Sequence, residues 1–309
     1  MKVLFMGTPE IAAGVLEAII NSKHEVIGVV TQEDKPKGRG KEMSMPPVKE
    51  LALSHNIPVF QPHILKTPES VEELRKFDAD IFVVVAYGKL LSKEILDMPK
   101  YGCINVHASL LPKYRGSAPI QWSIIDGEKV TGVTVMQMDE GMDTGDMLFK
   151  SAVEIEDTDT ADSLYDKLTK AGANIISDAL DAIEIGDIHP VKQDNENATY
   201  AKMLNKALGH VNYSRPAVEI ERLVRGLNSW PGTYSFINGK SLKIWDVKVL
   251  DEASNGEPGT VALCENGRLT VNTIDKQLEI LSLQIEGKKR MDTKSFLLGY
   301  KIEAGNVLE

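Results

Sequence analysis

An asparagine and a histidine two residues apart are the side chains in this sequence best placed to do chemistry. Asn105 and His107 lie in the segment Gly102–Gly116 (GCINVHASLLPKYRG), where an apolar strand pattern runs into a loop with a proline and two cations. Residues i and i+2 of a strand point from the same face, so the amide and the imidazole project together, about 6.6 Å apart along the strand. Asp143 follows in a second polar loop, Asp139–Gly145, and can add a carboxylate to the pair.

These three groups suit a reaction in which negative charge develops on an oxygen. Asn105 and a cationic His107 can donate hydrogen bonds to an oxyanion, while Asp143 keeps the imidazole charged and relays a proton through water. No Ser, Cys or Lys is clearly placed as a nucleophile. An isolated Asn–His pair is often only a satisfied core pair, but the loop that follows and the later Asp143 favour chemistry. The pattern therefore predicts direct transfer between two bound substrates.

Cys103 shares the strand face of Asn105 and His107, which raises the alternative of a Cys–His nucleophile. At about 3.3 Å per residue, Cys103 lies roughly 13 Å from His107 along the strand, beyond hydrogen-bond reach. Cys103 is therefore expected to be a small buried side chain. The only other cysteine is Cys264. Two cysteines supply neither a disulfide framework nor a zinc site, and no His/Cys cluster has metal-ligand spacing, so no metal is expected.

The first half of the chain alternates apolar runs with helical patterns. Near-continuous apolar runs, typical of buried parallel strands, occur at Lys2–Met6, Glu25–Val30, Ile81–Ala86 and Ile104–Val106. Helices are predicted at Pro9–Ile20, Pro47–His55, Pro68–Lys76 and Ala118–Ile125, followed by strands at Thr131–Met138 and Asp146–Ile155 and a long helix at Thr160–Ile185. This order predicts an α/β, doubly wound, Rossmann-like sheet. Ligands of such sheets bind beyond the carboxyl ends of the strands, where Asn105 and His107 fall.

Composition is that of an ordinary globular protein with two domains. The chain has 309 residues, of which 42% are hydrophobic and 26% charged. No apolar run approaches the roughly 20 residues of a membrane span, and the opening MKVLFMGTPE indicates a first strand and turn, not a signal peptide. We therefore expect a reduced, cytoplasmic protein.

Met6-Gly-Thr-Pro lacks the later glycines of a dinucleotide-binding turn, and no phosphate-cradling Gly-Lys-Ser/Thr occurs, so neither NAD nor ATP is expected.

The last third of the sequence has a different pattern. Gly186–His210 is polar and is interpreted as a linker, and a helix is predicted at Arg215–Leu227. Asn238-Gly239 between Thr233–Phe236 and Ser241–Val249 is a strong hairpin signal. About five short strands separated by turn signals predict a small β-barrel, similar to the oligonucleotide-binding (OB-like) type.

Charge is unevenly divided along the chain. The net charge is −10, yet from Asn205 onward 14 Lys and Arg stand against 13 Asp and Glu, so the excess of acid lies before this point. The C-terminal cations are grouped, as are those of the loop Gln32–Lys49, which holds Lys35, Lys37, Arg39 and Lys41 around two glycines. From charge alone, solvated surfaces are the better interpretation. A cationic loop beside the carboxyl edge of the sheet can also clamp phosphates.

Several segments resemble the methionyl-tRNA formyltransferase family, and they follow in family order over nearly the whole chain. They are FMGTPE, DKPKGRGKEM with PPVK, VVAYGKLL, INVHASLLPKYRGSAPIQWSI, MDEGMDTGDML, RGLNSWPGTYS and KKRMDTKSFLLGY. The Asn-x-His, Ser-Leu-Leu-Pro and distal Asp are shared with other 10-formyltetrahydrofolate transferases, so by themselves they indicate formyl transfer only. The Arg39 loop and the C-terminal barrel are the features similar to the tRNA enzymes.

The resemblance implies transfer of a formyl group from 10-formyltetrahydrofolate to the α-amine of methionyl initiator tRNA. It makes Asn105, His107 and Asp143 the catalytic set. It assigns folate binding to Ser109, Leu110, Leu111 and Pro112, with Tyr87, Lys89, Leu91 and Asp139 lining the pterin pocket. It assigns tRNA binding to Lys37, Arg39 and Lys41 at the acceptor stem and to Lys206, together with C-terminal cations, along the backbone.

The expected domains are residues 1–188 for catalysis and folate binding, a linker at 189–210, and an OB-like tRNA-binding domain at 211–309. We expect a monomer without membrane attachment. Two alternatives stay open. A formyltransferase acting on a small amine, such as a purine precursor or an amino sugar, would leave the C-terminal domain without a role. A non-catalytic RNA-binding module would leave the intact Asn105, His107 and Asp143 set unexplained.

Overall fold

The structure is a computed structural model, and it describes residues 1–37 and 42–309. Contacts divide the chain into two compact units. The first unit consists of Met1–Pro119, Val130–Glu154 and Tyr165–Ala201, and the second of Ile120–Lys129, Ile155–Leu164 and Lys202–Glu309. The domain boundaries expected from the sequence stay a prediction. Residues 189–201, expected to be linker, are packed in the first unit.

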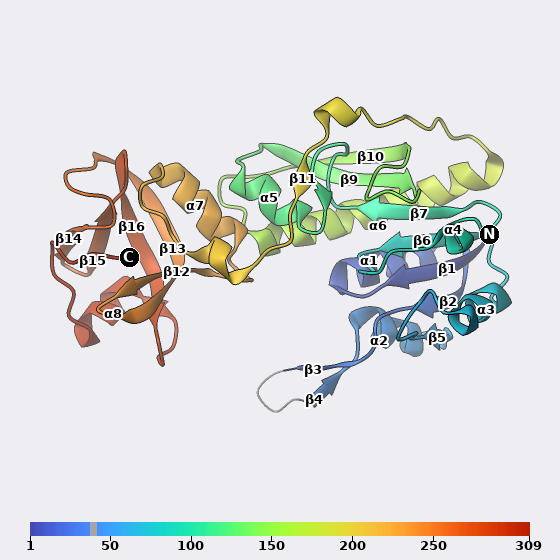
Figure 1. Ribbon diagram of the computed structural model, residues 1–309, viewed down its shortest axis with the longest axis horizontal. Helices are drawn as coiled ribbons and strands as arrows, with labels where there is room; N and C mark the ends of the chain where they lie inside the picture. Colours follow the sequence, from blue (N-terminus) through green and yellow to red (C-terminus); the bar gives the residue numbers. More distant parts are fainter. Residues whose placement is uncertain (38–41) are drawn as a thin grey trace. The chain divides into compact units, whose positions relative to one another are not determined.

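A seven-stranded sheet in the order β10-β9-β7-β6-β1-β2-β5 forms the centre of the first unit (Figure 1). Its strands are β1 (Lys2–Gly7), β2 (Glu25–Val30), β5 (Val59–Phe60), β6 (Ile81–Val85), β7 (Cys103–His107), β9 (Val130–Gln137) and β10 (Met147–Glu154). Strands β7 to β5 in this order are parallel, β9 pairs antiparallel with β7, and β10 pairs antiparallel with β9. The chain builds outward from β1 through β2 to β5 and then returns to β6 beside β1. This confirms the predicted doubly wound fold, and such a reversal of strand order marks the ligand-binding edge.

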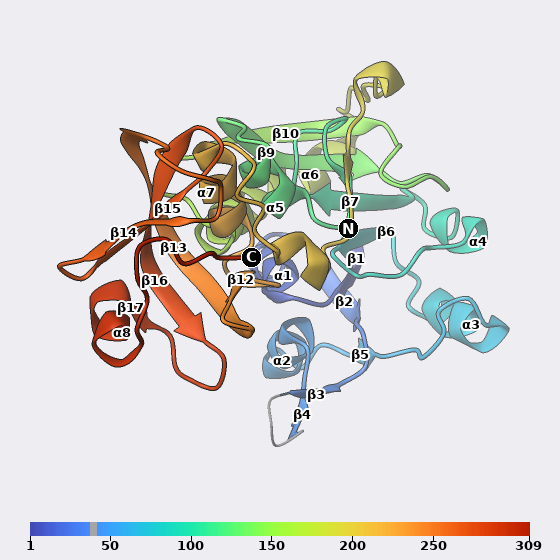
Figure 2. The same ribbon diagram turned by 60° about the vertical axis from the view of Figure 1, so that its left-hand side comes forward.

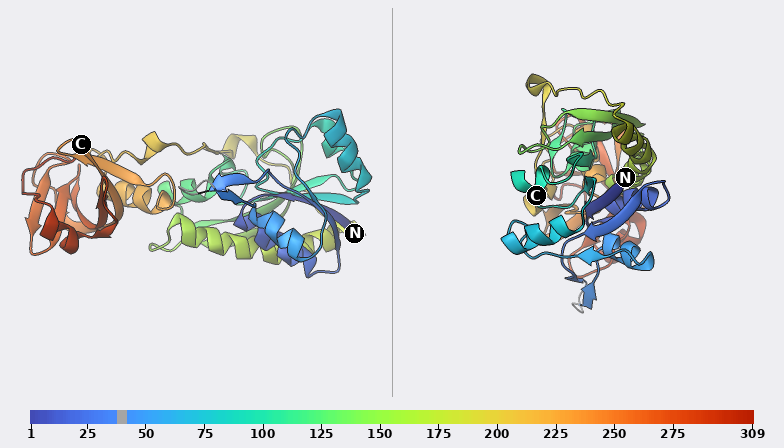
Figure 3. Two further views of the ribbon diagram at one scale, coloured as in Figure 1. Left: turned by 90° about the horizontal axis from the view of Figure 1, so that it is seen from below. Right: turned by 90° about the vertical axis from the view of Figure 1, so that its right-hand side faces the viewer.

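The two faces of the sheet are covered by different helices. The helices of this unit are α1 (Glu10–Ile20), α2 (Pro47–Ser54), α3 (Pro68–Lys76), α4 (Lys93–Leu96) and most of α6 (Ala161–Ile185), whereas α5 (Pro119–Ile125) belongs almost entirely to the second unit. Leu74 of α3 and Ile95 of α4 share a core cluster with Cys103. Val106 points to the other face of the sheet, and a Cβ added at Gly172 of α6 would lie 3.4 Å from its side chain. Helix α6 therefore covers the face opposite to α3 and α4 (Figure 3). Because strand residues alternate, Asn105 and His107 project from the Cys103 face.

Local sequence accounts for the start and end of the helices, as α3 illustrates. The Thr67 hydroxyl accepts a hydrogen bond from the Ser70 N–H at 3.2 Å, which satisfies one of the free donors at the helix start. Pro68 occupies the first turn, and Arg75 and Lys76 complement the helix dipole in the last turn. Among the described residues, no helix is both long and apolar enough to cross a bilayer.

The second unit is β-rich, and its sheet closes on itself. Strands β12 (Thr233–Ile237), β13 (Lys240–Ala253), β16 (Lys276–Ile285), β15 (Arg268–Asn272) and β14 (Val261–Glu265) pair in this order, with β17 (Met291–Asp292) beside β16. The last residues of the chain then join the two outer strands. Val261 donates to the Asn306 carbonyl at one side, and Phe236 donates to the Glu309 carbonyl at the other, both at 2.8 Å. Residues 305–309 thus complete a barrel (Figure 2).

Helices and turns of the barrel follow the sequence closely. Asn238 and Gly239 connect β12 to β13 with φ values of +51° and +72°, the left-handed conformation that a two-residue hairpin turn requires. Helix α7 (Ala217–Gly226) packs on β13 and β16, and α8 (Thr293–Gly299) follows β17. The hairpin at Asn238-Gly239 and the helix at Arg215–Leu227 are therefore confirmed.

Closure of the barrel by the last residues leads to a prediction about stability. Leu308 is 2% exposed and belongs to the barrel core, whereas Leu298 of α8 is 88% exposed. We expect Leu308→Ala to lower the free energy of unfolding of the second unit by about 2–5 kcal/mol, because the change removes buried methyl groups and leaves a cavity. The matched change Leu298→Ala should cost less than about 0.5 kcal/mol. Denaturant titrations of the two variants measure both values, and equal effects would contradict closure by this segment.

Candidate active site

Strand β7 presents Asn105 and His107 at its carboxyl end. Asn105 pairs with Met136 of β9, and His107 pairs with Thr134. The His107 ring is 7% exposed, and its Nε2 lies 2.9 Å from the backbone carbonyl of Tyr114. A carbonyl only accepts, so Nε2 carries the hydrogen and Nδ1 is the atom left to face the site.

Asp143 completes the group from the loop after β9. Its Oδ2 lies 3.8 Å from His107 Nδ1, and its Oδ1 lies 3.5 Å from the Asn105 amide nitrogen. The Gly116 N–H donates to Oδ2 at 2.7 Å and fixes the carboxylate. The structure thus brings the three side chains together. Their separations leave room for a polar substrate atom, and catalytic contacts that are long in a free enzyme tighten in the complex.

The segment that holds His107 and Asp143 is supported by residues that lie far away in the sequence. Arg115 and Gly116 form a short strand, β8 (Arg115–Gly116), that pairs in parallel with β11 (Tyr200–Ala201). The N–H of Tyr114, whose carbonyl binds His107, donates to the Thr199 hydroxyl at 2.8 Å. Sequence analysis missed this support because 85 residues separate Tyr114 from Thr199. The polar segment 189–201 carries no local signal that it forms part of a site.

The turn Ser109–Pro112, which is expected to contact folate, is hydrogen-bonded to strand β9 of the sheet. The Ser109 hydroxyl donates to the Lys113 carbonyl at 2.6 Å, and the Thr134 hydroxyl donates to the Ser109 carbonyl at 2.7 Å. Leu111 is buried with Met136 and Met147, and its carbonyl accepts from Lys150 at 2.6 Å. Leu110 is half-buried, and Pro112 follows a cis peptide bond. Ser109 and Leu111 therefore hold the backbone of this turn, and their side chains do not project freely.

The segment after β6 holds Tyr87, Lys89 and Leu91, the other residues expected near the pterin. Tyr87 and Leu91 belong to the core cluster of Cys103 and are 1% and 8% exposed, and burial raises the pKa of Tyr87 to about 12. The Lys89 ammonium donates to the carbonyls of Pro62 and His63 at 2.7 and 2.9 Å. These three side chains anchor their loop, and Leu90 beside them is 65% exposed.

Asp139 shapes the loop that carries Asp143. Its Oδ1 accepts hydrogen bonds from the Gly141 N–H at 3.0 Å and from the Thr144 hydroxyl at 2.7 Å. Asp139 also lines a cavity of about 470 Å³ beside α4, together with Lys93, Leu96, Asp97, Pro99, Lys100, Gly102, Gln137, Met138 and Glu140. Of the residues expected to bind folate, Asp139 is the one that reaches this cavity.

The residues expected to bind tRNA belong to two segments, the loop Gln32–Lys49 and the region of Lys206. Lys37 is the last residue of β3 (Lys35–Lys37), which forms a hairpin with β4 (Glu42–Ser44). Arg39 and Lys41 lie outside the described residues. Lys206 is exposed at the start of a short 3₁₀ helix, Lys206–Gly209, in the second unit.

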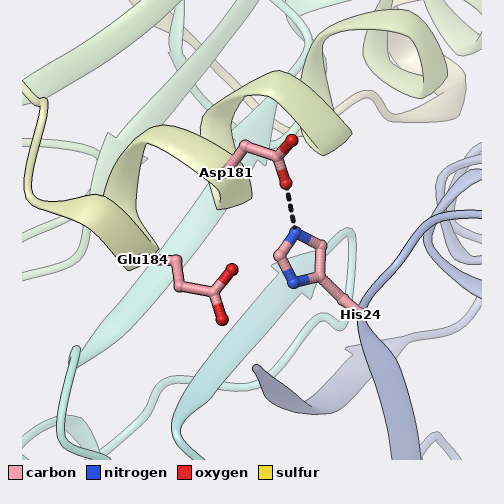
Figure 4. Close-up of side chains that lie close together, drawn as sticks. All are labelled: His24, Asp181 and Glu184. Carbon is pink, nitrogen blue, oxygen red and sulfur yellow. Dashed lines mark hydrogen bonds and ion pairs between the residues drawn. The ribbon is translucent and has the colours of Figure 1, made fainter.

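One group of metal-capable side chains occurs in the described part of the chain, away from the site. His24 Nε2 lies 2.8 Å from Asp181, and Glu184 lies nearby on α6 (Figure 4). The Lys23 ammonium is 3.1 Å from Asp181, and the Met1 α-amino group is 3.1 Å from Glu184. A hydrogen bond from Lys23 and a weaker one from His24 lower the pKa of Asp181. Cations of the protein already balance these carboxylates, so we interpret the group as an ion-pair network.

Cys103 is confirmed as a buried side chain, and its exclusion from the chemistry stays a prediction. It is 1% exposed, and burial raises the pKa of its thiol to about 12. We expect Cys103→Ala to keep formyl-transfer turnover within about threefold of wild type, because neither thiolate formation nor contact with His107 is available to it. Turnover measurements on the variant, with the Cys264→Ala variant as a matched control, check this. A loss of tenfold or more in Cys103→Ala alone would bring the Cys–His alternative back.

This fold and this site define an enzyme of the formyl-transfer class. Residues 1–180 match the family described as formyl transferase, and residues 203–301 match its C-terminal domain. The methionyl-tRNA formyltransferase of Agathobacter rectalis is 54% identical over 306 residues, covering 99% of each chain, and that of Clostridioides difficile is 49% identical over 308 residues, covering 100% of each. The chain belongs to the methionyl-tRNA formyltransferase family.

A solved structure has the same fold at much lower identity. The sugar 3N-formyltransferase WlaRD, crystallised in the presence of dTDP and 5-N-formyl-THF, superposes with a TM-score of 0.68 at 23% identity, covering 94% of this chain and 99% of that one. At this identity the likeness establishes the architecture only. The fold is therefore compatible with acceptors other than tRNA, and the choice of acceptor needs an argument of its own.

Proposed function

We propose that this protein transfers the formyl group of 10-formyltetrahydrofolate to the α-amine of methionyl initiator tRNA, in the cytoplasm. The observation that carries the proposal is the identity of 47–54% with methionyl-tRNA formyltransferases over 99–100% of this chain, C-terminal unit included. The convergence of Asn105, His107 and Asp143 supplies the chemistry.

The proposed mechanism is direct acyl transfer between the two substrates. The α-amine attacks the formyl carbon, a C–N bond forms, and the carbonyl oxygen becomes an oxyanion. The Asn105 amide and the Nδ1–H of a protonated His107 donate hydrogen bonds to this oxygen. His107 points Nδ1 inward because its Nε2–H is used on the Tyr114 carbonyl.

Asp143 is the acceptor of the proton that the attacking nitrogen must lose. Its carboxylate accepts this proton through water, and the collapse of the intermediate breaks the bond to N10 of the folate, which takes up a proton. Asp143 also places its carboxylate 3.8 Å from His107 Nδ1, so a negative charge lies beside the ring that donates to the oxyanion. In this scheme the products are formyl-methionyl-tRNA and tetrahydrofolate, so atoms and charge balance without a metal or redox cofactor.

Substrate binding is assigned to the segments around this set. Ser109–Pro112 holds the folate near His107, with Tyr87, Lys89 and Leu91 anchoring one wall of the pterin pocket and Asp139 shaping another. Of these residues only Asp139 lines the cavity beside α4, so the assignment rests on the family resemblance and on the proximity of Ser109–Pro112 to His107 in the chain. Lys37, Arg39 and Lys41 contact the acceptor stem, and Lys206 contacts the tRNA backbone, where cations contribute salt-sensitive affinity.

A competition between acceptors tests the proposal. Labelled 10-formyltetrahydrofolate is offered with methionyl initiator tRNA, with methionyl elongator tRNA and with amino-sugar nucleotides or purine-precursor amines. We expect label on the initiator tRNA alone. Label only on a small amine would make the enzyme a small-molecule formyltransferase. Salt-sensitive tRNA binding without label under saturating donor would indicate a binding module.

A further inference from the structure

A buried glutamine connects the segment after α6 to the loop that carries Asp143. Gln193 is 9% exposed, and its amide nitrogen donates to the backbone carbonyls of Asp143 and Gly145, both at 2.8 Å. Both hydrogens of the Gln193 amide therefore donate to the loop Asp139–Gly145, one to the carbonyl before Thr144 and one to the carbonyl after it. Attachment at two points sets the direction in which the Asp143 side chain leaves the backbone.

Arg115 determines which way this amide points. Its Nε donates to Gln193 Oε1 at 3.0 Å, and a terminal nitrogen donates to the Asn195 side-chain oxygen at 2.8 Å. A guanidinium has only donors, so the Gln193 oxygen must face Arg115 and the nitrogen must face the loop. Arg115 is 2% exposed, and an unpaired buried guanidinium is very costly, so this contact resists breaking.

The Asp143 backbone needs such external support. Its φ of +54° lies in the left-handed region, which is unfavourable for a residue with a side chain and persists only when its surroundings hold it. Gln193 holds the carbonyl of this residue, while Gly116, next to Arg115 in β8, holds the carboxylate. Strand β8 therefore fixes Asp143 from both ends.

We propose that Gln193, oriented by Arg115, is a positioning residue that sets the Asp143 carboxylate against Asn105 and His107. The inference rests on the proposed function, in which Asp143 accepts the proton. Without the two hydrogen bonds, the Asp143 backbone is free to leave its unfavourable conformation and carry the carboxylate away from the imidazole. A displacement of about 1 Å of a reacting group costs up to about 10²-fold in rate.

The first experiment compares two glutamines in formyl-transfer kinetics. Gln193→Met keeps the size of the side chain and removes its donors, and we expect kcat to fall about 10- to 100-fold with KM for both substrates within about threefold of wild type. Gln61 is a matched control, since its amide also donates to two oxygens of the first unit, the Gln32 carbonyl and the Asp34 carboxylate. Gln61→Met should leave kcat within about twofold. An unchanged kcat in Gln193→Met would overturn the inference.

A double-mutant cycle with Asp143→Asn separates positioning from a general structural effect. If Gln193 acts through Asp143, Gln193→Met should lower the single-turnover rate by less than about twofold in the Asp143→Asn background. The same fold loss in both backgrounds would overturn the inference while leaving the role of Asp143 intact. Wild-type turnover in Asp143→Asn itself would remove the role on which the inference rests.

A measurement without substrates keeps the test independent of activity. The Gly116 amide donates to the Asp143 carboxylate, so its hydrogen exchange reports where that carboxylate lies. By NMR we expect this exchange to be at least about tenfold faster in Gln193→Met and unchanged in Gln61→Met. If Gln193→Met does not fold, Gln193→Glu retains the contact with Arg115 and still lacks both donors. Unchanged Gly116 exchange in the folded variant would overturn the inference, even for an enzyme that formylates a different acceptor.

Discussion

Asn105→Ala should lower kcat for formyl transfer by about 10²–10³, the cost of removing one hydrogen-bond donor from an oxyanion. The Asn105 amide projects from the strand face shared with His107 and lies 3.5 Å from the Asp143 carboxylate. The hydrogen bond from this amide is stronger to the oxyanion of the transition state than to the carbonyl of the bound substrate, so KM for both substrates should change little. Single-turnover assays with labelled formyl donor measure the chemical step directly.

Asn21→Ala is the control for this first prediction. Asn21 is exposed at the end of α1, where it contributes its backbone N–H and no side-chain contact to the helix end. Its turnover should match wild type. Near-wild-type turnover in Asn105→Ala would remove this amide from the mechanism and leave His107 as the one oxyanion donor of the pair.

Asp143→Asn should lower kcat by about 10²–10⁴, the range for loss of a general acid–base group. The substitution keeps the shape of the side chain, yet it removes the proton acceptor and the negative charge beside the His107 ring. It also replaces one acceptor oxygen by a donor near Gly116, whose N–H needs an acceptor. Folate binding is assigned to other residues, so the affinity for the donor should stay close to wild type, and equilibrium titration of formyl-folate checks this.

The matched control for the carboxylate is Asp187→Asn, because the Asp187 side chain is 73% exposed and its ion-pair partner His189 is exposed as well. Its kcat should be unchanged. A large loss of folate affinity in Asp143→Asn with a normal single-turnover rate at saturation would assign Asp143 to binding. A small effect on both quantities would leave the proton transfer to solvent alone.

The doubly wound class of the fold and the central residues of the candidate site can be predicted from local sequence, whereas the order of the strands in the sheet cannot. Buried parallel strands are continuous apolar runs, so the segment before Asn105 is recognisable as a strand, and its period of two places Asn105 and His107 on one face. The same spacing separates Cys103 from the chemistry, and its burial in the α3–α4 core agrees. The hairpin at Asn238-Gly239 is equally local, because a two-residue turn requires left-handed conformations that these residue types tolerate.

The orientation of the site was decided by contacts that no local pattern encodes. His107 exposes Nδ1 because a carbonyl seven residues later accepts from Nε2, and Asp143 is held by Gly116 and by Gln193, 50 residues further along the chain. The assignment of Tyr87 and Lys89 to the folate pocket stays a prediction; the Tyr87 side chain lies in the core and the Lys89 ammonium donates to backbone carbonyls. The barrel likewise closes through the last residues of the chain.

Sequence alone therefore determined which groups are proposed to do the chemistry and on which strand face Asn105 and His107 lie. Residue type and period are short-range properties, and 105 and 107 need only the strand between them to point together. Tertiary structure decided which atom of each group faces the substrate. Hydrogen-bond partners such as Arg115 and Gln193 lie 78 residues apart and meet only when β8 pairs with β11. Their burial makes each lost contact costly, and so they hold the catalytic set in one arrangement.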